Sequence, residues 1–417
     1  MALSVIRRKE GLVKPAEETP LTTLDLSAID KLGVLRCNVR TLHVFKHGPQ
    51  AARVIREALS KALVPYYPLA GRLIEPKPGC LQIQCSAHGV WLVEASSHST
   101  LHSLNYFDNL HSIPYDDLLP ESESQCIQPL VQMQVTEFGC GGFVMGLIFC
   151  HSICDGLGAA QFLNAIGELA RGLDKPSVEP VWQRDFFPSQ QIALPPNPIP
   201  PMAEYKLEHA NIDMPMDQIK GVKREFEQAT GRTCSAFEVV AAACWASRTR
   251  AIQFRPNTQL KLVFFANCRN LVEPPLPNGF YGNCFFPVSI SASCESLTNA
   301  SMVDVVKLIK EAKGKVGAEF GKYLKGEQLE EPFAPPLTYT TLFVSEWGRL
   351  GFNHVDYRWG PPVHVVPIQG SAVIPVAIVG SLPLPNKGIR LMTWCVEDPH
   401  RTPFLHHIHI HMACMNV

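Results

Sequence analysis

The sequence lacks an excess of charge of either sign, a long apolar run and any internal repeat. Its 417 residues include 37 basic and 38 acidic side chains, so the formal net charge is −1. Without a basic block, binding to nucleic acid or to an anionic membrane is not expected. No segment approaches the roughly 20 apolar residues that span a bilayer, and the N-terminus lacks the apolar core of a signal peptide. We therefore expect a cytoplasmic protein.

Cys-x-x-Cys pairs are absent as well, although the chain has 14 cysteines. A zinc site built from paired thiolates is therefore not expected. The cysteines are scattered through apolar segments, as is typical of reduced thiols in the cytosol. With 46% hydrophobic residues the chain can form substantial cores, and its length fits two domains better than one.

Strand-like and helix-like segments alternate along the chain, which predicts a mixed α/β fold. In the first half we expect helices at 50–63 and 157–171, and strands at 41–45, 81–85 and 90–94, the last two paired with each other. In the second half we expect helices at 216–230, 234–250 and 301–318, and strands at 260–267, 284–290, 338–344, 373–379 and 389–396.

Prolines dominate the segment between these halves, residues 176–216, and indicate an extended linker because proline opposes both helix and central strand. We therefore assign residues 1–175 to an N-terminal lobe, 176–216 to a crossover linker and 217–417 to a C-terminal lobe.

The strongest chemical signal is the stretch His151-Ser-Ile-Cys-Asp155-Gly156, which lies between a strand-like run and a helix-like segment. Such a strand would present His151 from a rigid support, and histidine is the side chain best suited to accept a proton near neutral pH. His151 is therefore the candidate general base. Asp155 stands at a helix start, where it can cap the helix and fix the loop. Gly156 would let another chain or a ligand approach the backbone closely.

This stretch, together with Cys140-Gly-Gly-Phe-Val-Met-Gly before it, resembles the first signature of plant BAHD acyltransferases. The second signature of that family, Asp-Phe-Gly-Trp-Gly, has its counterpart in Asp356-Tyr-Arg-Trp-Gly360. The residues around His151 are most similar to the taxane and benzyl-alcohol-type subgroup. Other segments agree in order along nearly the whole chain: Leu26-Ser-Ala-Ile-Asp30, Tyr67-Pro-Leu-Ala-Gly-Arg72, Ser235-Ala-Phe-Glu238, Tyr281-Gly-Asn283 and Ser345-Glu-Trp347.

The resemblance implies two similar-sized lobes, each a mixed sheet with flanking helices, with an active-site channel between them. It implies transfer of an acyl group from acyl-CoA to an alcohol or amine of a plant specialised metabolite. Acyl-CoA would be a cosubstrate, with no permanently bound cofactor and no metal. The protein would act as a monomer with these small molecules as its partners.

The resemblance also assigns roles to residues outside the first signature. Arg269 would pair with Asp155 and lock the loop. Asp356 and Trp359 would complete the catalytic set, with Gly360 supporting their turn, since an indole N–H can stabilise an oxyanion. Each of these residues has an ordinary structural role as its alternative. The predicted coenzyme A contacts are Ser235, Tyr281, Asn283, Ser345 and Trp347.

Two positions of the second signature depart from the family. Tyr357 replaces phenylalanine, which is a mild change, and Arg358 replaces glycine. Arginine would be costly there if the backbone has a positive φ. We expect Arg358 to form a salt bridge that steadies the turn, with attraction to a coenzyme A phosphate as the alternative.

Other functions stay open at this stage. A degenerate second signature is compatible with a binding module of the same fold that catalyses nothing. Cys150 and Cys154 flank His151, so a thiol-dependent thioester hydrolase is a further alternative. The histidine-rich C-terminal segment invites a metal site, since alternating histidines share one face of a strand. We expect instead that this segment is a frayed terminus.

Overall fold

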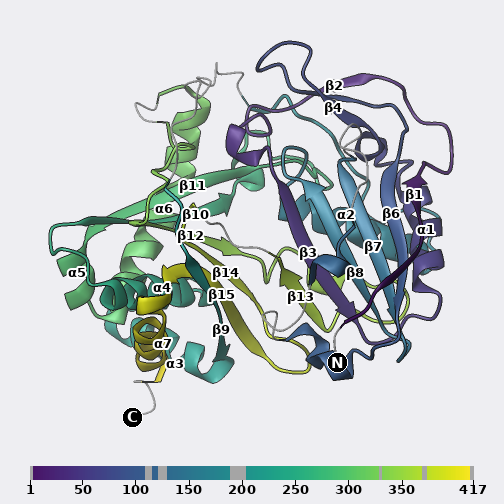
Figure 1. The fold of residues 1–417 in the computed structure, drawn as a ribbon. Coiled ribbons are helices and arrows are strands. Elements are labelled where there is room, and N and C mark those ends of the chain that lie inside the picture. Colours follow the sequence, from purple (N-terminus) through teal and green to yellow (C-terminus); the bar gives the residue numbers. More distant parts are fainter. Residues whose placement is uncertain are drawn as a thin grey trace.

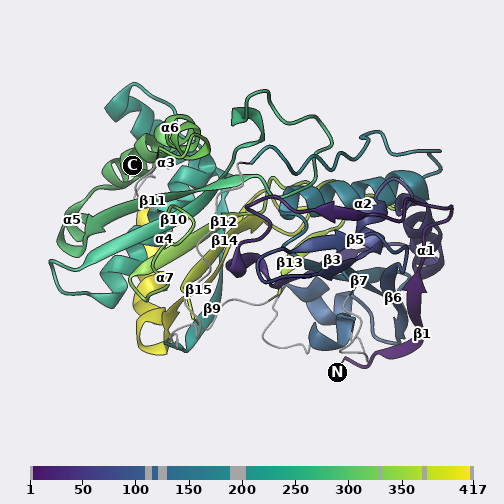
Figure 2. The ribbon, with the colours of Figure 1, turned by 90° about the horizontal axis from the view of Figure 1, so that it is seen from above.

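The computed structural model describes residues 3–108, 115–120, 129–187, 203–327, 331–368 and 373–413. Two lobes lie side by side, and each is built on a six-stranded mixed sheet (Figures 1 and 2). Within the described ranges, none of the helices combines the length and the apolar character needed to cross a bilayer.

The first lobe contains the sheet that leads to His151. Its strand order is β1 (Ile6–Val13), β6 (Val90–Ser97), β7 (Val131–Phe138), β8 (Phe143–Cys150), β3 (Asn38–Phe45) and β13 (His364–Pro367). Helices α1 (Ala51–Ala62) and α2 (Gly156–Ala170) share one hydrophobic core with this sheet. A small separate sheet has the order β2 (Thr23–Asp25), β5 (Gln82–Gln84) and β4 (Arg72–Ile74).

The second lobe has its helices on the side of the sheet that faces away from the first lobe (Figures 1 and 2). The strand order is β11 (Phe285–Ser293), β10 (Gln259–Asn267), β12 (Thr341–Glu346), β14 (Val376–Ser381), β15 (Gly388–Glu397) and β9 (Leu207–Pro215). The helices are α3 (Met216–Thr230), α4 (Ala236–Ile252), α5 (Cys294–Asn299), α6 (Met302–Leu324) and α7 (Asp398–Ala413). Short 3₁₀ turns are η1 (Gly33–Leu35), η2 (Tyr67–Ala70), η3 (His102–Phe107), η5 (Tyr115–Leu118), η6 (Arg269–Leu271) and η7 (Phe352–His354).

The predicted helices and strands occur close to their expected positions, but one predicted pairing is wrong. The strand expected at 81–85 is β5, which pairs with β2 and β4, whereas the strand expected at 90–94 is β6, which pairs with β1 and β7. Alternating hydrophobicity identifies a strand, but it does not identify its partner.

Three segments cross the predicted lobe boundaries. β9 lies inside the predicted linker and pairs with β15. Its buried Ala210, Ile212 and Met214 follow strand periodicity, which the neighbouring prolines obscured. β13 comes from the C-terminal half but extends the first sheet beside β3. The segment around Ile29 and Leu32 packs into the core of the second lobe. The proline-rich stretch 188–202 lies outside the described residues.

The C-terminal segment is helical, so the prediction of a frayed terminus is wrong. Helix α7 packs against α4, and its Phe404, Ile408 and Met412 are buried in the core of the second lobe. Their spacing of four residues is that of one helix face. His411 lies on the same helix, where its Nδ1 is 2.8 Å from the Ser247 hydroxyl. The alternation of histidines concealed this helical pattern.

Candidate active site

His151 is the first residue after β8, near the middle of the first sheet. Residues 143–149 of β8 are all buried, so the strand is a rigid support. The His151 ring is half-buried and lies between the lobes. Its centroid is 6.4 Å from that of Phe149 in the first lobe and 6.4 Å from that of Phe285 in the second. The His151 ring therefore lies beside residues of both lobes.

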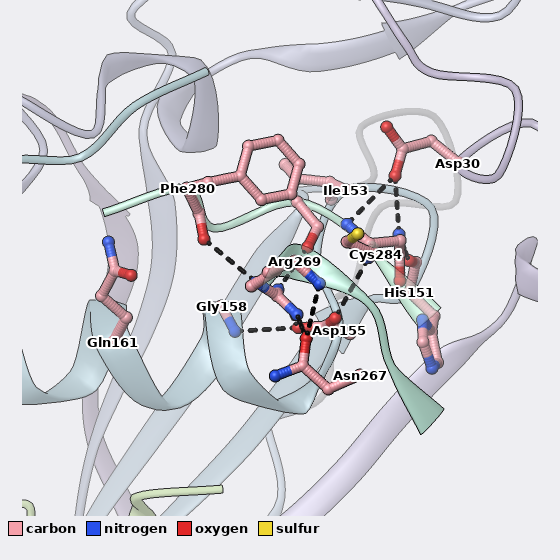
Figure 3. A network of polar contacts seen from close by, with 12 residues as sticks. Asp30, His151, Ile153, Asp155, Gly158, Gln161, Asn267, Arg269, Phe280 and Cys284 are labelled. Carbon is pink, nitrogen blue, oxygen red and sulfur yellow. Dashed lines mark hydrogen bonds and ion pairs between the residues drawn. The ribbon is translucent and has the colours of Figure 1, made fainter. Parts of the chain in front are cut away.

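The backbone around His151 is held by segments that are distant in sequence (Figure 3). The His151 N–H donates to the carbonyl of Cys37 at 2.9 Å, and its carbonyl accepts from the side-chain amide of Asn283 at 2.8 Å. The Ser152 hydroxyl donates to the Leu35 carbonyl at 3.0 Å. Because both sides of the loop are tied down, the position of His151 is fixed before any substrate binds.

Asp155 is buried, and its carboxylate points away from the His151 ring toward the second lobe (Figure 3). One oxygen accepts from the Gly158 N–H at 3.0 Å, which caps α2, and from Arg269 Nη2 at 2.8 Å. The other oxygen accepts from the Cys284 N–H at 3.3 Å. The predicted ion pair with Arg269 is therefore confirmed. Burial alone would lower the pKa of Arg269, but Asp155 outweighs it and the pKa is raised.

Two buried charged residues next to the loop that bears His151 were not predicted to belong to the site. Asp30 and Arg184 form an ion pair of 3.1 Å with side-chain exposures of only 0% and 2%. Asp30 also accepts from the Asn283 side-chain amide at 2.8 Å, and Arg184 donates to the carbonyl of Ile153 at 2.9 Å. Asp30 lies in a segment that matches the family, which was a usable signal. Arg184 lies in the predicted linker, where no pattern marks it.

Glycines allow the second lobe to approach this loop. A Cβ added to Gly158 would lie 1.9 Å from the Tyr281 carbonyl oxygen, and one added to Gly282 would lie 1.6 Å from Arg184 Nη1. The predicted Gly156 is less constrained, since its added Cβ would meet only the flexible end of the Leu350 side chain at 2.5 Å. Gly158 therefore permits the close approach of the Tyr281 backbone to this loop, whereas Gly282 leaves the space that the Arg184 guanidinium occupies.

The cysteines beside His151 are poor nucleophiles. Burial raises the pKa of the Cys150 thiol, and it raises the pKa of the fully buried Cys154 thiol well above its ordinary value. The reactive species of a cysteine nucleophile is the thiolate, which these surroundings disfavour. This argues against the thiol-dependent hydrolase.

The second signature forms a tight turn at the edge of the first lobe. One Asp356 carboxylate oxygen accepts from the N–H groups of Arg358 at 2.8 Å and Gly360 at 2.9 Å. Arg171 donates to the Asp356 carbonyl. Arg358 has a φ of +89° and Gly360 a φ of +92°, so the turn requires the left-handed region at both positions. The arginine therefore occupies a position where glycine would be unstrained.

This turn is remote from His151. The Trp359 ring packs edge-on against Phe143 at 6.0 Å, and Phe143 begins the strand that ends beside His151, about 23 Å away. The Asp356 backbone lies against Gly167 of α2, about 18 Å along the helix from Asp155. The prediction that Asp356 and Trp359 are catalytic is therefore wrong, because both stabilise the far end of the lobe.

The two departures from the family have different surroundings. Tyr357 is fully buried between Phe45 and Phe143, and its hydroxyl finds no hydrogen-bond partner among the described residues. Arg358 is exposed, and within the described ranges no ion pair to its guanidinium is formed. The salt bridge expected for Arg358 is therefore not present there.

Two of the five predicted coenzyme A contacts are wrong. Tyr281 and Asn283 are 2% and 0% exposed, so neither side chain is accessible to a ligand. Trp347 and Ser345 are half-buried at the end of β12, where the indole N–H donates to the Ser345 hydroxyl at 3.1 Å. Ser235 caps α4 in a capping box with Glu238. Coenzyme A binding by Ser235, Ser345 and Trp347 stays a prediction.

Comparison with known proteins gives consistent matches over almost the whole chain. The model of the Transferase family matches residues 3–388. Acyl transferase 4 of Oryza sativa subsp. japonica is 44% identical, with 97% of this chain and 98% of the relative covered. The 3'-N-debenzoyl-2'-deoxytaxol N-benzoyltransferase of Taxus canadensis is 35% identical, with 92% and 91% covered.

Two solved structures share the fold. Vinorine synthase superposes with a TM-score of 0.76 at 20% identity, covering 99% of this chain and 98% of that one. TRI101 of F. graminearum, crystallised with coenzyme A and T-2 mycotoxin, has a TM-score of 0.73 at 13% identity, covering 91% and 96%. The predicted mixed α/β fold with two lobes is thereby confirmed.

Proposed function

The chain belongs to the Transferase family, the BAHD acyltransferases, and we propose that it moves an acyl group from acyl-CoA to an alcohol or amine with His151 as general base. The observation that carries this proposal is the placement of His151. Its ring is half-buried at the end of a rigid strand, between the lobes, with its backbone held on both sides.

We infer that Nε2 is the nitrogen of His151 that meets the acceptor, since Nδ1 is buried and without a hydrogen-bond partner among the described residues. In the proposed reaction, the acceptor O–H or N–H donates to Nε2. Nε2 takes this proton as the acceptor attacks the thioester carbonyl carbon. Collapse of the tetrahedral intermediate breaks the carbon–sulfur bond, and the departing coenzyme A thiolate recovers the proton from the imidazolium. No acyl-enzyme is needed, in keeping with the raised pKa values of Cys150 and Cys154.

The catalytically silent binding module is not favoured. Its main support was Arg358 in the second signature, and that turn lies at the far end of β8 from His151. The substitution therefore leaves the surroundings of the proposed base unchanged.

Aromatic side chains form the wall of the second lobe beside His151. Leu260, Leu262 and Phe264 of β10 pack into the helix-covered core, so Phe265 points to the opposite face of the sheet. Phe265 is 45% exposed, and its ring lies 5.2 Å from that of Phe285, the neighbour of His151. We infer that the apolar part of a substrate packs against Phe265.

We also propose that the protein is a cytoplasmic monomer and that Ser235, Ser345 and Trp347 contact the coenzyme A moiety. The cysteines in the described part of the chain are free thiols, as expected for the cytosol. TRI101, which shares the fold, was crystallised with coenzyme A, and this supports acyl-CoA as the donor here.

The test is release of free coenzyme A thiol from acetyl-, benzoyl- and caffeoyl-CoA in the presence of a panel of alcohols and amines. Acceptor-dependent thiol release is expected with wild-type protein and should be lost in His151→Ala. Thiol release without any acceptor would favour a hydrolase, and an acylated cysteine peptide after quenching would favour a covalent route. The absence of turnover with every pair, while acyl-CoA still binds, would favour the binding module.

A further inference from the structure

We propose that Asp30 and Arg184 are positioning residues that hold His151 in its reactive placement, an inference that rests on the proposed role of His151 as general base. They reach the loop through two contacts. The Asn283 side-chain amide donates both to Asp30 and to the His151 carbonyl, each at 2.8 Å. Arg184 donates directly to the Ile153 carbonyl at 2.9 Å.

The Asn283 side-chain nitrogen is the link between the ion pair and the base. One of its N–H bonds points to Asp30 Oδ1 and the other to the His151 carbonyl, so the amide bridges the two groups. The Asn283 backbone N–H also faces Asp30 Oδ1, at 3.4 Å. Without Asp30, nothing in these contacts would orient the amide toward His151.

The surroundings of Arg184 fix its guanidinium in one place. It lies over the Trp182 ring at 4.2 Å and near the rings of Phe280 and Tyr281 at 5.3 and 5.4 Å. Gly282 leaves the space that its Nη1 occupies. A buried ion pair contributes little net stability compared with well-packed apolar side chains, because both charges lose their hydration. The Asp30–Arg184 pair instead orients the groups to which it is hydrogen-bonded, the Asn283 amide and the Ile153 carbonyl.

Three parts of the chain meet at this pair. Asp30 follows Ile29, which packs in the core of the second lobe, Arg184 belongs to the linker, and Asn283 precedes β11. The loop that bears His151 belongs to the first lobe. The Asp155–Arg269 pair holds the end of this loop at residue 155, whereas the Asp30–Arg184 pair holds residues 151 and 153. The two pairs therefore act on different parts of the loop.

The experiment compares Asp30→Ala/Arg184→Met with wild type, since removing both charges avoids leaving one buried and unpaired. We expect kcat to fall about 30-fold, while KM for acyl-CoA and for the acceptor stays within about threefold, because a small displacement of a base slows chemistry more than binding. Arg184→Lys keeps the charge but not the forked geometry, so its kcat should lie between those of wild type and double variant.

The matched control is Arg56→Gln/Glu94→Gln, which removes a partly buried ion pair between α1 and β6, away from the loop. It should leave kcat within about twofold even where its melting temperature falls. Wild-type kcat in the folded double variant would overturn the proposal, as would an equal loss of kcat in the control. If the double variant does not fold, unchanged kcat in Arg184→Lys overturns it. Activity in His151→Ala would instead overturn the proposed function itself.

Discussion

The two family signatures of this chain lie at opposite ends of the same strand and helix. His151 and Asp155 follow β8 and begin α2, whereas Trp359 packs on the start of β8 and Asp356 lies beside the later turns of α2. Both signatures are recognisable in the sequence, although the second departs from the family at Tyr357 and Arg358. Only the first places a titratable side chain where the lobes meet, so a specific motif need not be a catalytic one.

The two regions also differ in how much change they accept. The loop after β8 has its backbone and its carboxylate bonded to segments from three parts of the chain. The 356–360 turn is closed by the Asp356 carboxylate, and its contacts outside the turn are with the first lobe, at Arg171, Phe45 and Phe143. This explains how Tyr357 and Arg358 can replace the family residues there without disturbing His151.

The largest expected effect is that of His151→Ala. Removing a general base commonly costs 10²–10⁴ in rate, so we expect kcat to fall about 1000-fold. The melting temperature should stay within a few degrees, because the ring is half-buried and accepts no hydrogen bond through Nδ1 in the described part of the chain. Stopped assays with equal amounts of folded protein, checked by circular dichroism, measure this. Substantial remaining activity would show that His151 is not the general base.

Asp155→Asn should have the next largest effect. Asparagine can still cap α2, but the substitution removes the charge partner of the Arg269 guanidinium, whose side chain is only 13% exposed. We expect a loss of about 3 kcal/mol in unfolding free energy and a 10- to 100-fold lower kcat through a displaced loop. Urea denaturation and steady-state kinetics separate the two effects. If the variant is as stable as wild type, the Asp155–Arg269 ion pair does not contribute to the unfolding free energy.

The sequence predicted the chemistry of the site better than its architecture. The position of His151 after a strand, the cap at Asp155 and its pairing with Arg269 all follow from local pattern and resemblance, and the structure contains them. The misplacement of Asp356 and Trp359 has a physical reason. Their distance from His151 depends on which end of β8 the turn meets, and neither local pattern nor spacing determines such a long-range contact.

The same limit explains the missed residues. Asp30 and Arg184 act only as a pair that is brought together by folding, and each alone is an ordinary charged residue in the sequence. Tyr281 and Asn283 were predicted to contact coenzyme A because they match family positions that do so. Burial decides otherwise, and burial depends on the docking of the two lobes.

Phe265→Ala tests whether the apolar part of a substrate packs against Phe265, and it leaves the proposed general base His151 in place. We expect KM for one substrate to rise about fivefold, corresponding to roughly 1 kcal/mol of lost apolar contact, with kcat within about twofold. Trp359→Phe is the matched control in the remote turn and should leave both KM values unchanged. Equal effects of the two substitutions would contradict the separation of the two regions.

Arg358→Gly tests the turn. The arginine holds a φ of +89°, so glycine should relieve strain and raise the unfolding free energy by about 1 kcal/mol, after its own entropic cost. Activity should stay within about twofold at low and at high ionic strength. A KM for acyl-CoA that rises only in the variant, and most at low salt, would instead assign Arg358 to the donor phosphates.

The smallest expected effect is that of Tyr357→Phe. The Tyr357 side chain is fully buried, burial raises its pKa, and its hydroxyl finds no partner among the described residues. An unbonded buried hydroxyl costs free energy, so its removal should raise the unfolding free energy by about 0.5 kcal/mol without changing kcat. Tyr66→Phe is the matched control, because the Tyr66 hydroxyl accepts from Gln161 at 3.0 Å, and it should lose about 1 kcal/mol. If both substitutions lower the unfolding free energy equally, the Tyr357 hydroxyl forms a hydrogen bond in solution. The 356–360 turn would then be attached to the core by one more hydrogen bond than the structure contains among the described residues.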